Sequence, residues 1–120
     1  MQVVINGLNL GIESSDRVYA EKRLRSALGR FADRLSRVTL ILEDVNGPRG
    51  GADKEGRLLV QLKRGAPIAV SVAAISLRHA IDLAAARAKR SVSRMSDRLT
   101  RRRRKGRSIG SMAVDESGDV

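Results

Sequence analysis

The chemistry that this sequence most clearly offers is the binding of phosphate groups by arginine and lysine. The stretch RAKRSVSRMSDRLTRRRRK, residues 87–105, becomes denser in basic residues until five stand in a row. Residues 78–107 contain 12 basic and 2 acidic residues, whereas residues 1–77 contain 12 and 8. An excess of positive charge concentrated in one segment is typical of a protein that binds a polyanion.

Other kinds of site have little support in the sequence. The chain has no cysteine, so it offers no thiol nucleophile, disulfide or thiolate metal site. Its single histidine, His79, has no partner at catalytic spacing. The Gly-rich stretch NGPRGG, residues 46–51, lacks the GK[ST] ending of a nucleotide-binding P-loop and reads as a hairpin connection. We therefore expect a protein that is not an enzyme, with no cofactor, no metal and no small-molecule substrate.

Hydrophobic periodicity predicts the elements that must position the basic residues. Strands are expected at 2–6, 38–43, 57–63 and 67–73, helices at 16–35 and from 76 to about 104, and a loop at 44–56. Ser14, Ser15 and Asp16 are N-cap candidates for the first helix. This β-α-β-β-β-α order predicts an α+β fold in which one four-stranded sheet carries both helices on one face.

The chain length suits one domain, at residues 1–104, followed by a flexible basic-to-acidic tail at 105–120. The N-terminus lacks the features of a secretory signal, and no apolar run approaches the length of a membrane span. We expect a cytoplasmic protein with no membrane partner.

The second predicted helix combines an apolar stripe with a cationic strip. At 100° per residue the expected buried stripe is Leu77, Ala80, Ile81, Ala84, Ala88, Val92, Met95 and Leu99. The strip beside it is Arg87, Arg90, Arg94, Arg98 and Arg101. On the first helix, Tyr19, Arg23, Arg30 and Arg34 share a similar flank. If the helices pack side by side, the two strips could face each other across a groove, which the sequence does not decide.

The nature of the polyanion follows from what accompanies the arginines. Like charges three and four residues apart destabilise an isolated helix, so a merely solvated face would more usually mix its signs. An anionic membrane would require Trp, Phe or Leu on the apolar face. This helix has many alanines there, and packing on the sheet already accounts for the larger residues. Tyr19 and Phe31 are the only aromatic residues, which argues against a base-stacking platform. Nucleic acid bound through phosphate contacts and shape is the favoured ligand.

Three stretches together resemble the ribosome hibernation-promoting factor family in its short form, which includes the translation inhibitor protein Y. They are VVINGLNLGI, LGRFADRLSRV and SLRHAIDLAAARAKRSVSRMSDRL, and the resemblance covers residues 1 to about 100. It is most specific at residues 31–35, similar to the family's F-D-R-I helix end, and at 80–82, similar to its Y-x-A-I-D helix start. Where the family has that tyrosine, this chain has Arg78.

The resemblance implies a fold related to double-stranded RNA-binding domains and a translation inhibitor that occupies the mRNA and tRNA sites of the small ribosomal subunit in resting cells. It implies that a basic groove between the helices contacts rRNA. The residues carried over are Arg23, Arg30, Arg87, Lys89, Arg90, Arg94 and Arg98, and the continuing strips add Arg34, Arg101 and Arg102. The C-terminal domain with which long-form relatives pair ribosomes is not expected in a chain of this length.

Two other functions are compatible with the same residues. A general double-stranded RNA- or DNA-binding module would use the basic patch without ribosomal specificity. A protein-interaction domain for an acidic partner would need no nucleic acid, and it would lack the steep salt dependence that counterion release from phosphates produces.

Overall fold

The computed structural model describes the backbone of residues 1–45 and 53–111, and the side chains of residues 1–45 and 53–100. The chain divides into two compact units, residues 1–90 and 91–120. The elements in order are β1 (Gln2–Leu8), α1 (Ser14–Leu28), the 3-10 helix η1 (Gly29–Arg34), β2 (Leu35–Asp44), β3 (Lys54–Leu62), β4 (Ile68–Ala74) and α2 (Leu77–Ser111). This order confirms the predicted α+β fold.

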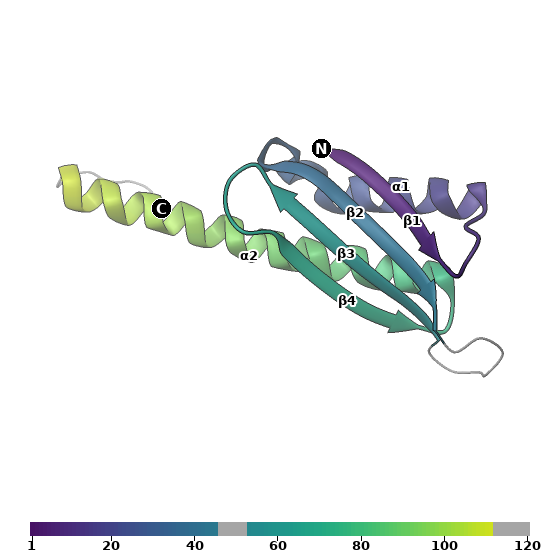
Figure 1. Ribbon diagram of the computed structural model, residues 1–120. Helices are drawn as coiled ribbons and strands as arrows, with labels where there is room; N and C mark the ends of the chain where they lie inside the picture. The colour runs from purple at the N-terminus through teal and green to yellow at the C-terminus, as the bar shows by residue number, and fades with distance from the viewer. Residues whose placement is uncertain (46–52, 112–120) are drawn as a thin grey trace. The chain divides into compact units, whose positions relative to one another are not determined.

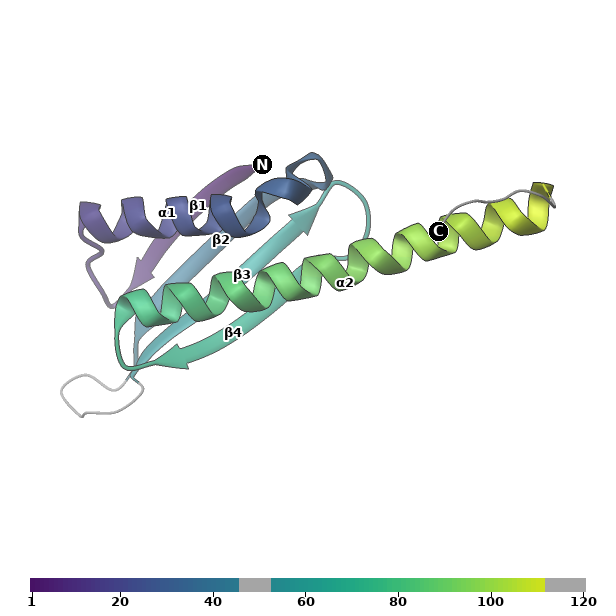
Figure 2. The same cartoon turned by 180° about the vertical axis from the view of Figure 1, so that it is seen from behind.

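The first unit is built on one mixed sheet with the strand order β1-β2-β3-β4. β1 pairs in parallel with β2, and α1 supplies the crossover connection that a parallel pair requires. The other two pairings are antiparallel. Figures 1 and 2 show α1 and the beginning of α2 together on one face of this sheet, while the opposite face is open.

The core lies between the helices and the covered face of the sheet. Side chains alternate along β2, where Val38, Leu40 and Leu42 are fully buried. The helices present mainly small residues to this face, among them the fully buried Ala80 and Ala84. Small side chains let α2 pack close to the sheet. At Gly56 of β3, an added Cβ would lie 3.2 Å from a methyl group of Val72, 3.5 Å from one of Leu42 and 3.8 Å from the Ala80 carbonyl oxygen.

The first helix is shorter than its periodicity predicted. α1 ends at Leu28, and residues 29–34 continue as η1. Gly29 has the lowest helix propensity apart from proline, yet the tighter winding still buries Phe31. The N-cap is Glu13, which makes no side-chain capping hydrogen bond. The prediction of an N-cap among residues 14–16 was therefore wrong, since these residues form the first turn.

The second helix begins where it was predicted and continues further. The Ser76 hydroxyl accepts a hydrogen bond from the His79 backbone N–H at 3.1 Å and so caps the first turn. α2 runs through Gly106 to Ser111, beyond the expected end near 104. Residues 112–120 of the predicted tail lie outside the described residues, as do residues 46–52 of the predicted loop. The division at residue 104 stays a prediction.

The buried stripe of α2 also ends earlier than predicted. Val92 is fully buried, but Met95 is only half-buried and Leu99 is 36% exposed. The expectation that the last two belong to the core was wrong. Helical spacing identifies the residues that share a face, but not the length over which that face is covered.

Candidate nucleic-acid interface

One flank of α2 faces α1, and a network of polar side chains joins the two helices there. The Tyr19 hydroxyl donates a hydrogen bond to Asp82 Oδ1 at 2.6 Å. Arg23 Nε lies 3.3 Å from the same oxygen. The Arg23 side chain is 35% exposed and the Asp82 side chain is 41% exposed. The Asp82 carboxylate thus holds two residues of α1, and Arg23 is already paired with a negative charge.

The same network continues toward the beginning of α2. Arg78 Nε forms an ion pair with Asp16 Oδ1 at 3.0 Å. Its guanidinium also stacks on the Tyr19 ring, 4.5 Å from the centroid, in a cation–π contact. Arg78 occupies the position at which the resembling family has tyrosine, and here it fastens α2 to α1. Asp16, Tyr19, Arg23, Arg78 and Asp82 together form what we call the seam.

The seam changes the titration of its tyrosine. The hydrogen bond to Asp82 raises the pKa of Tyr19 above the ordinary value of 10.0 because deprotonation would remove the donated proton. Partial desolvation and the negative charge of Asp82 act in the same direction, whereas the charges of Arg23 and Arg78 oppose them. The seam is therefore most stable with a neutral phenol. Its two arginines and two carboxylates leave it with no net charge.

The opposite flank of α2 lies beside β4. Arg87 Nη1 donates a hydrogen bond to the Ser71 carbonyl oxygen at 3.0 Å. Arg87 follows Asp82 by five residues, which turns it about 140° around the helix axis. Arg90 follows three residues later and is exposed. A carbonyl partner orients the Arg87 guanidinium without neutralising its charge.

This geometry decides the question of the facing strips. Asp82 faces α1, so Arg87 turns away from α1 toward the edge of the sheet. The possibility that the Arg87 strip faces the α1 strip across a groove is wrong within the first unit. Lys89 follows Asp82 by seven residues and returns to the α1 side. A sequence without tertiary contacts could not have separated these two flanks.

The remaining predicted residues fall into two groups. Arg30 and Arg34 lie in η1, where Arg30 is exposed and its guanidinium sits 4.9 Å from the Phe31 ring centroid, while Arg34 is half-buried. In the second unit Arg94 and Arg98 are exposed, with the exposed Asp97 between them in sequence. The backbone of Arg101 and Arg102 belongs to α2, and their side chains lie outside the described residues.

The exposed basic residues of α2 carry uncompensated charge. Within residues 1–45 and 53–100, no ion pair involves Arg87, Lys89, Arg90, Arg94 or Arg98. We call Arg87, Arg90, Arg94 and Arg98 the arginine row. Guanidinium groups that have no carboxylate partner bind phosphate oxygens strongly, often with two hydrogen bonds. Arg87 and Arg90 of the first unit, and Arg94 and Arg98 of the second, therefore each have the chemistry to bind phosphate.

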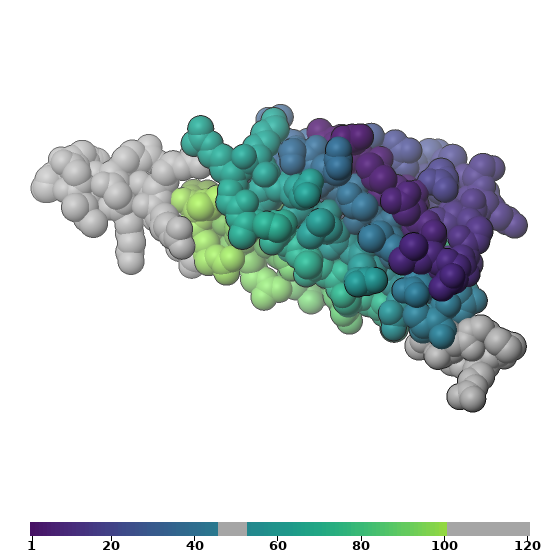
Figure 3. Space-filling view, in the orientation of Figure 1, coloured from purple at the N-terminus to yellow at the C-terminus, as the bar shows by residue number. Residues whose placement is uncertain are grey.

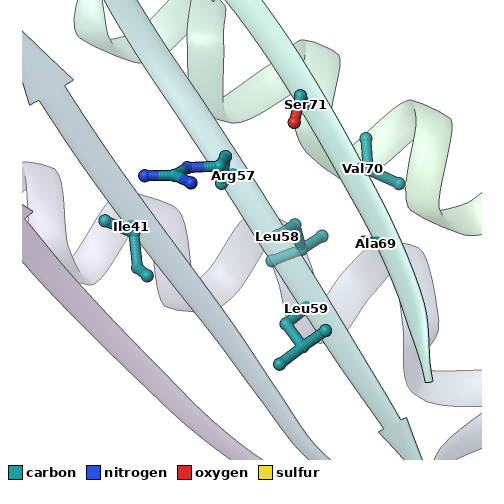
Figure 4. A pocket seen from close by; sticks show the side chains of 7 residues that line it. All are labelled: Ile41, Arg57, Leu58, Leu59, Ala69, Val70 and Ser71. Atoms are coloured by element: carbon teal, nitrogen blue, oxygen red, sulfur yellow. The ribbon is translucent and has the colours of Figure 1, made fainter.

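Other kinds of site are less developed in the described part of the chain. A shallow hollow opens on the uncovered face of the sheet (Figure 4), lined by Ile41, Arg57, Leu58, Leu59, Ala69, Val70 and Ser71. Arg57 is its one charged side chain. Among the described residues, no three His, Asp or Glu side chains gather as metal ligands. No described helix combines the length and apolar character needed to cross a bilayer.

Sequence reasoning missed Arg78 as a member of the seam. The available signal was its place in the first turn of α2, four residues before Asp82, on the same face of the helix. The partners Asp16 and Tyr19 are 62 and 59 residues away in the chain. Only the packing of the two helices brings them together.

Comparison with known proteins gives a result at the level of structure. No protein-family model and no curated protein matches the sequence. The Protein Y N-terminal domain of Thermus thermophilus matches with a TM-score of 0.65 and 27% identity, over 79% of this chain and 99% of that domain. A ribosomal subunit interface protein from Coxiella burnetii has the same fold, with a TM-score of 0.66 and 19% identity, over 81% of this chain and 99% of that chain. The structural comparison therefore confirms the resemblance of this chain to the ribosome hibernation-promoting factor family.

Proposed function

We propose that this protein is a ribosome-associated translation inhibitor that binds small-subunit rRNA in resting cells. The observation that carries this proposal is the match to the Protein Y N-terminal domain, which extends over 99% of that domain. The second similar structure is named a ribosomal subunit interface protein, which supports the same kind of partner. The exposed arginines of α2 give this chain the phosphate-binding chemistry that such a role requires.

The proposed mechanism is occupancy without a chemical step. The arginine row, with Lys89, Arg30 and Arg34, neutralises rRNA phosphates and releases their counterions. Arg101 and Arg102 extend the basic residues along the α2 sequence. The folded domain then fills space that mRNA and tRNA would occupy. Of the basic residues in the proposed site, Arg23 contributes least to this binding because Asp82 already pairs with it.

The test is binding of the purified full chain to purified small ribosomal subunits in a sucrose gradient. We expect the protein to sediment with the subunits at low and moderate salt, and an mRNA fragment to be excluded from the complex. A protein that stays at the top of the gradient at low salt would contradict the ribosomal proposal.

A matched pair of variants separates a specific surface from general positive charge. One variant replaces Arg90, Arg94 and Arg98 by Gln. The control replaces Lys22, Arg37 and Arg57 by Gln. These residues are also exposed, and their replacement removes the same total charge from α1, β2 and β3. We expect the first variant to lose much more affinity than the control.

Binding to an RNA duplex tests the alternative function, a general nucleic-acid-binding module. A general double-stranded RNA- or DNA-binding module would bind a mixed-sequence RNA duplex as tightly as it binds the subunit. Competition between the duplex and the subunit for the wild-type protein measures this ratio. A large excess of duplex that fails to displace the protein favours the ribosomal function.

A further inference from the structure

The two ends of the sheet differ in charge. At one end β1 and β2 finish, β3 begins and β4 finishes, as the pairing of Asp44 with Lys54 and of Lys54 with Ala74 shows. The acidic residues Glu43, Asp44, Asp53 and Glu55 gather at this end. We call it the acidic end.

The one lysine at the acidic end is neutralised. Lys54 Nζ lies 3.3 Å from Asp44 Oδ2 and 3.3 Å from Asp53 Oδ1. Partial burial opposes the charged form, but the hydrogen bonds to Asp53 and Asp44 outweigh it and raise the pKa of Lys54. Among the described residues of this end, carboxylates outnumber cations, so a phosphate would be repelled.

The opposite end of the sheet carries η1 and the turn between β3 and β4. Leu35 pairs with Leu62 across β2 and β3. The Lys63 backbone N–H then donates a hydrogen bond to the Arg34 carbonyl oxygen at 3.0 Å. This hydrogen bond fixes the turn directly against η1. Gly65 completes the turn with φ of +99°, a conformation that glycine adopts without strain.

This second end is basic, and its cations are accessible. Lys63, Arg64 and Arg30 are all exposed. Figure 3 shows the segment between β3 and β4 projecting from the upper edge of the molecule. Asp33 is the single acidic residue within segments 29–37 and 61–68. Within the described residues no ion pair engages Lys63 or Arg64.

The helices bring a further cation to the same end. The contacts of Arg78 with Asp16 and of Asp82 with Tyr19 advance along both helices in the same direction, so α1 and α2 run parallel. In these contacts and in the Arg23–Asp82 pair, each residue of α2 meets a residue of α1 whose number is 59 to 63 lower. This spacing places Lys89 beside residues 26–30, where α1 ends. Lys89 is exposed and faces the α1 side. Three separate segments therefore present cations at this end of the first unit.

We propose that Lys63 and Arg64 of the β3–β4 turn form, together with Arg30 and Lys89, a phosphate-binding surface for RNA at the basic end of the sheet. The inference rests on the proposed function in taking RNA as the ligand. It adds a turn that neither periodicity nor resemblance assigned to binding. The turn lies between strands rather than on a helix, so it gives the protein a contact with RNA that is independent of the arginine row.

The test compares two double variants of equal charge. Lys63→Gln/Arg64→Gln removes the two cations of the turn and keeps Gly65. The control, Lys22→Gln/Arg57→Gln, removes two exposed cations from α1 and from the open face of the sheet. Circular dichroism and thermal melts first establish that both variants are folded. Binding is then measured against salt with purified small subunits and with a mixed-sequence RNA duplex.

We expect the turn variant to bind roughly ten-fold more weakly at moderate salt, with a salt slope reduced by about 1.5, as for two lost phosphate contacts. The control should stay within about two-fold of wild type, since non-contacting charges act only through a screened field. Equal losses in the two variants, or no loss in the turn variant, would overturn the inference.

The two ligands keep this inference separate from the ribosomal proposal. If wild type binds the duplex but not the subunit, the ribosomal function fails, and the turn is judged from the duplex alone. If wild type binds the subunit and only the control variant is weakened, the function stands and the turn assignment fails. Binding to neither ligand would overturn both.

Discussion

The two flanks of α2 carry the same kind of side chain in opposite electrostatic settings. On the α1 side Arg78 pairs with Asp16, and Asp82 pairs with Arg23. On the β4 side Arg87 has a neutral partner, the Ser71 carbonyl. The comparison teaches that the density of arginine along a sequence does not show where positive charge is available. Availability depends on which carboxylates the fold brings within reach.

The same comparison separates the contributions to stability and to binding. The seam joins two helices through ion pairs, a hydrogen bond and a cation–π contact. Partly exposed ion pairs contribute only about 0–1 kcal/mol each to folding, but they remove charge from the surface. The arginine row contributes little to folding, and its charge stays uncompensated, as the proposed binding of phosphates requires. Substitutions in the two regions should therefore change different measurements.

The largest expected effect is on binding by the arginine row. Replacing Arg87, Arg90, Arg94 and Arg98 by Gln removes about four phosphate contacts. The salt slope of RNA binding should fall by about 3, and affinity at moderate salt should fall by two to three orders of magnitude. Titration of a labelled rRNA fragment at several salt concentrations measures both. An unchanged slope in a folded variant would mean that the row is only a solvated surface.

The next effect separates the buried face of α2 from the row. Val92→Asp places a carboxylate at a fully buried position, which should cost roughly 3 kcal/mol of folding free energy. Arg94→Asp acts at an exposed position and should change stability by about 0.5 kcal/mol or less. Chemical denaturation of both variants gives these values.

Met95 supplies an internal control for that pair. Because its side chain is only half-buried, Met95→Asp should destabilise the folded protein less than Val92→Asp. The helical spacing alone had placed Met95 in the core. RNA affinity, corrected for the folded fraction, should be reduced most by Arg94→Asp. Unfolding by Arg94→Asp together with tolerance of Val92→Asp would contradict the assigned faces of α2.

A smaller effect compares single arginines in the two regions. Arg90→Gln should weaken RNA binding about five-fold at moderate salt, as for one phosphate contact. Arg23→Gln should change it by less than about two-fold because Asp82 already neutralises that guanidinium. Asp82→Asn serves as the converse variant. It should lower the melting temperature while leaving RNA binding equal to wild type or tighter, and weaker binding by the folded protein would contradict this.

The smallest effect is the pH dependence of the seam. The folded pKa of Tyr19 lies above 10.0, so the stabilising contribution of its neutral phenol is complete below pH 10. That contribution is lost as pH rises through the folded pKa. Melting temperatures of wild type and Tyr19→Phe between about pH 8 and 11 should therefore converge at the alkaline end. Parallel curves over this range would show that the hydrogen bond to Asp82 is not linked to stability.

Much of the fold could be predicted from the sequence because its signals are local. β-branched runs marked the strands, and apolar residues at helical spacing marked both helices. Where the prediction failed, a local signal competed with packing. The apolar residues up to Leu35 suggested one helix, but from Gly29 the chain continues as the 3-10 helix η1, in which Phe31 is buried. The pattern through Met95 and Leu99 continued past the point at which burial ends.

The candidate site was less predictable because its features depend on tertiary contacts. The composition of residues 78–107 shows where basic residues are concentrated along the sequence. It could not reveal that Arg78 pairs with a carboxylate 62 residues earlier. Nor could it reveal that Arg87 turns toward β4 while Lys89 turns toward α1. The phase of a helix against its neighbours is set by the packing of the whole domain.

The measurement that tests the central claim most directly compares two double variants that remove equal charge from the first unit. Arg87→Gln/Arg90→Gln alters the row, and Arg23→Gln/Arg78→Gln alters the seam. Small-subunit binding is measured for both as a function of salt. The account predicts that the row variant lowers the salt slope by about 1.5 and the seam variant by less than about 0.5. Equal reductions, or a larger reduction in the folded seam variant, would contradict it.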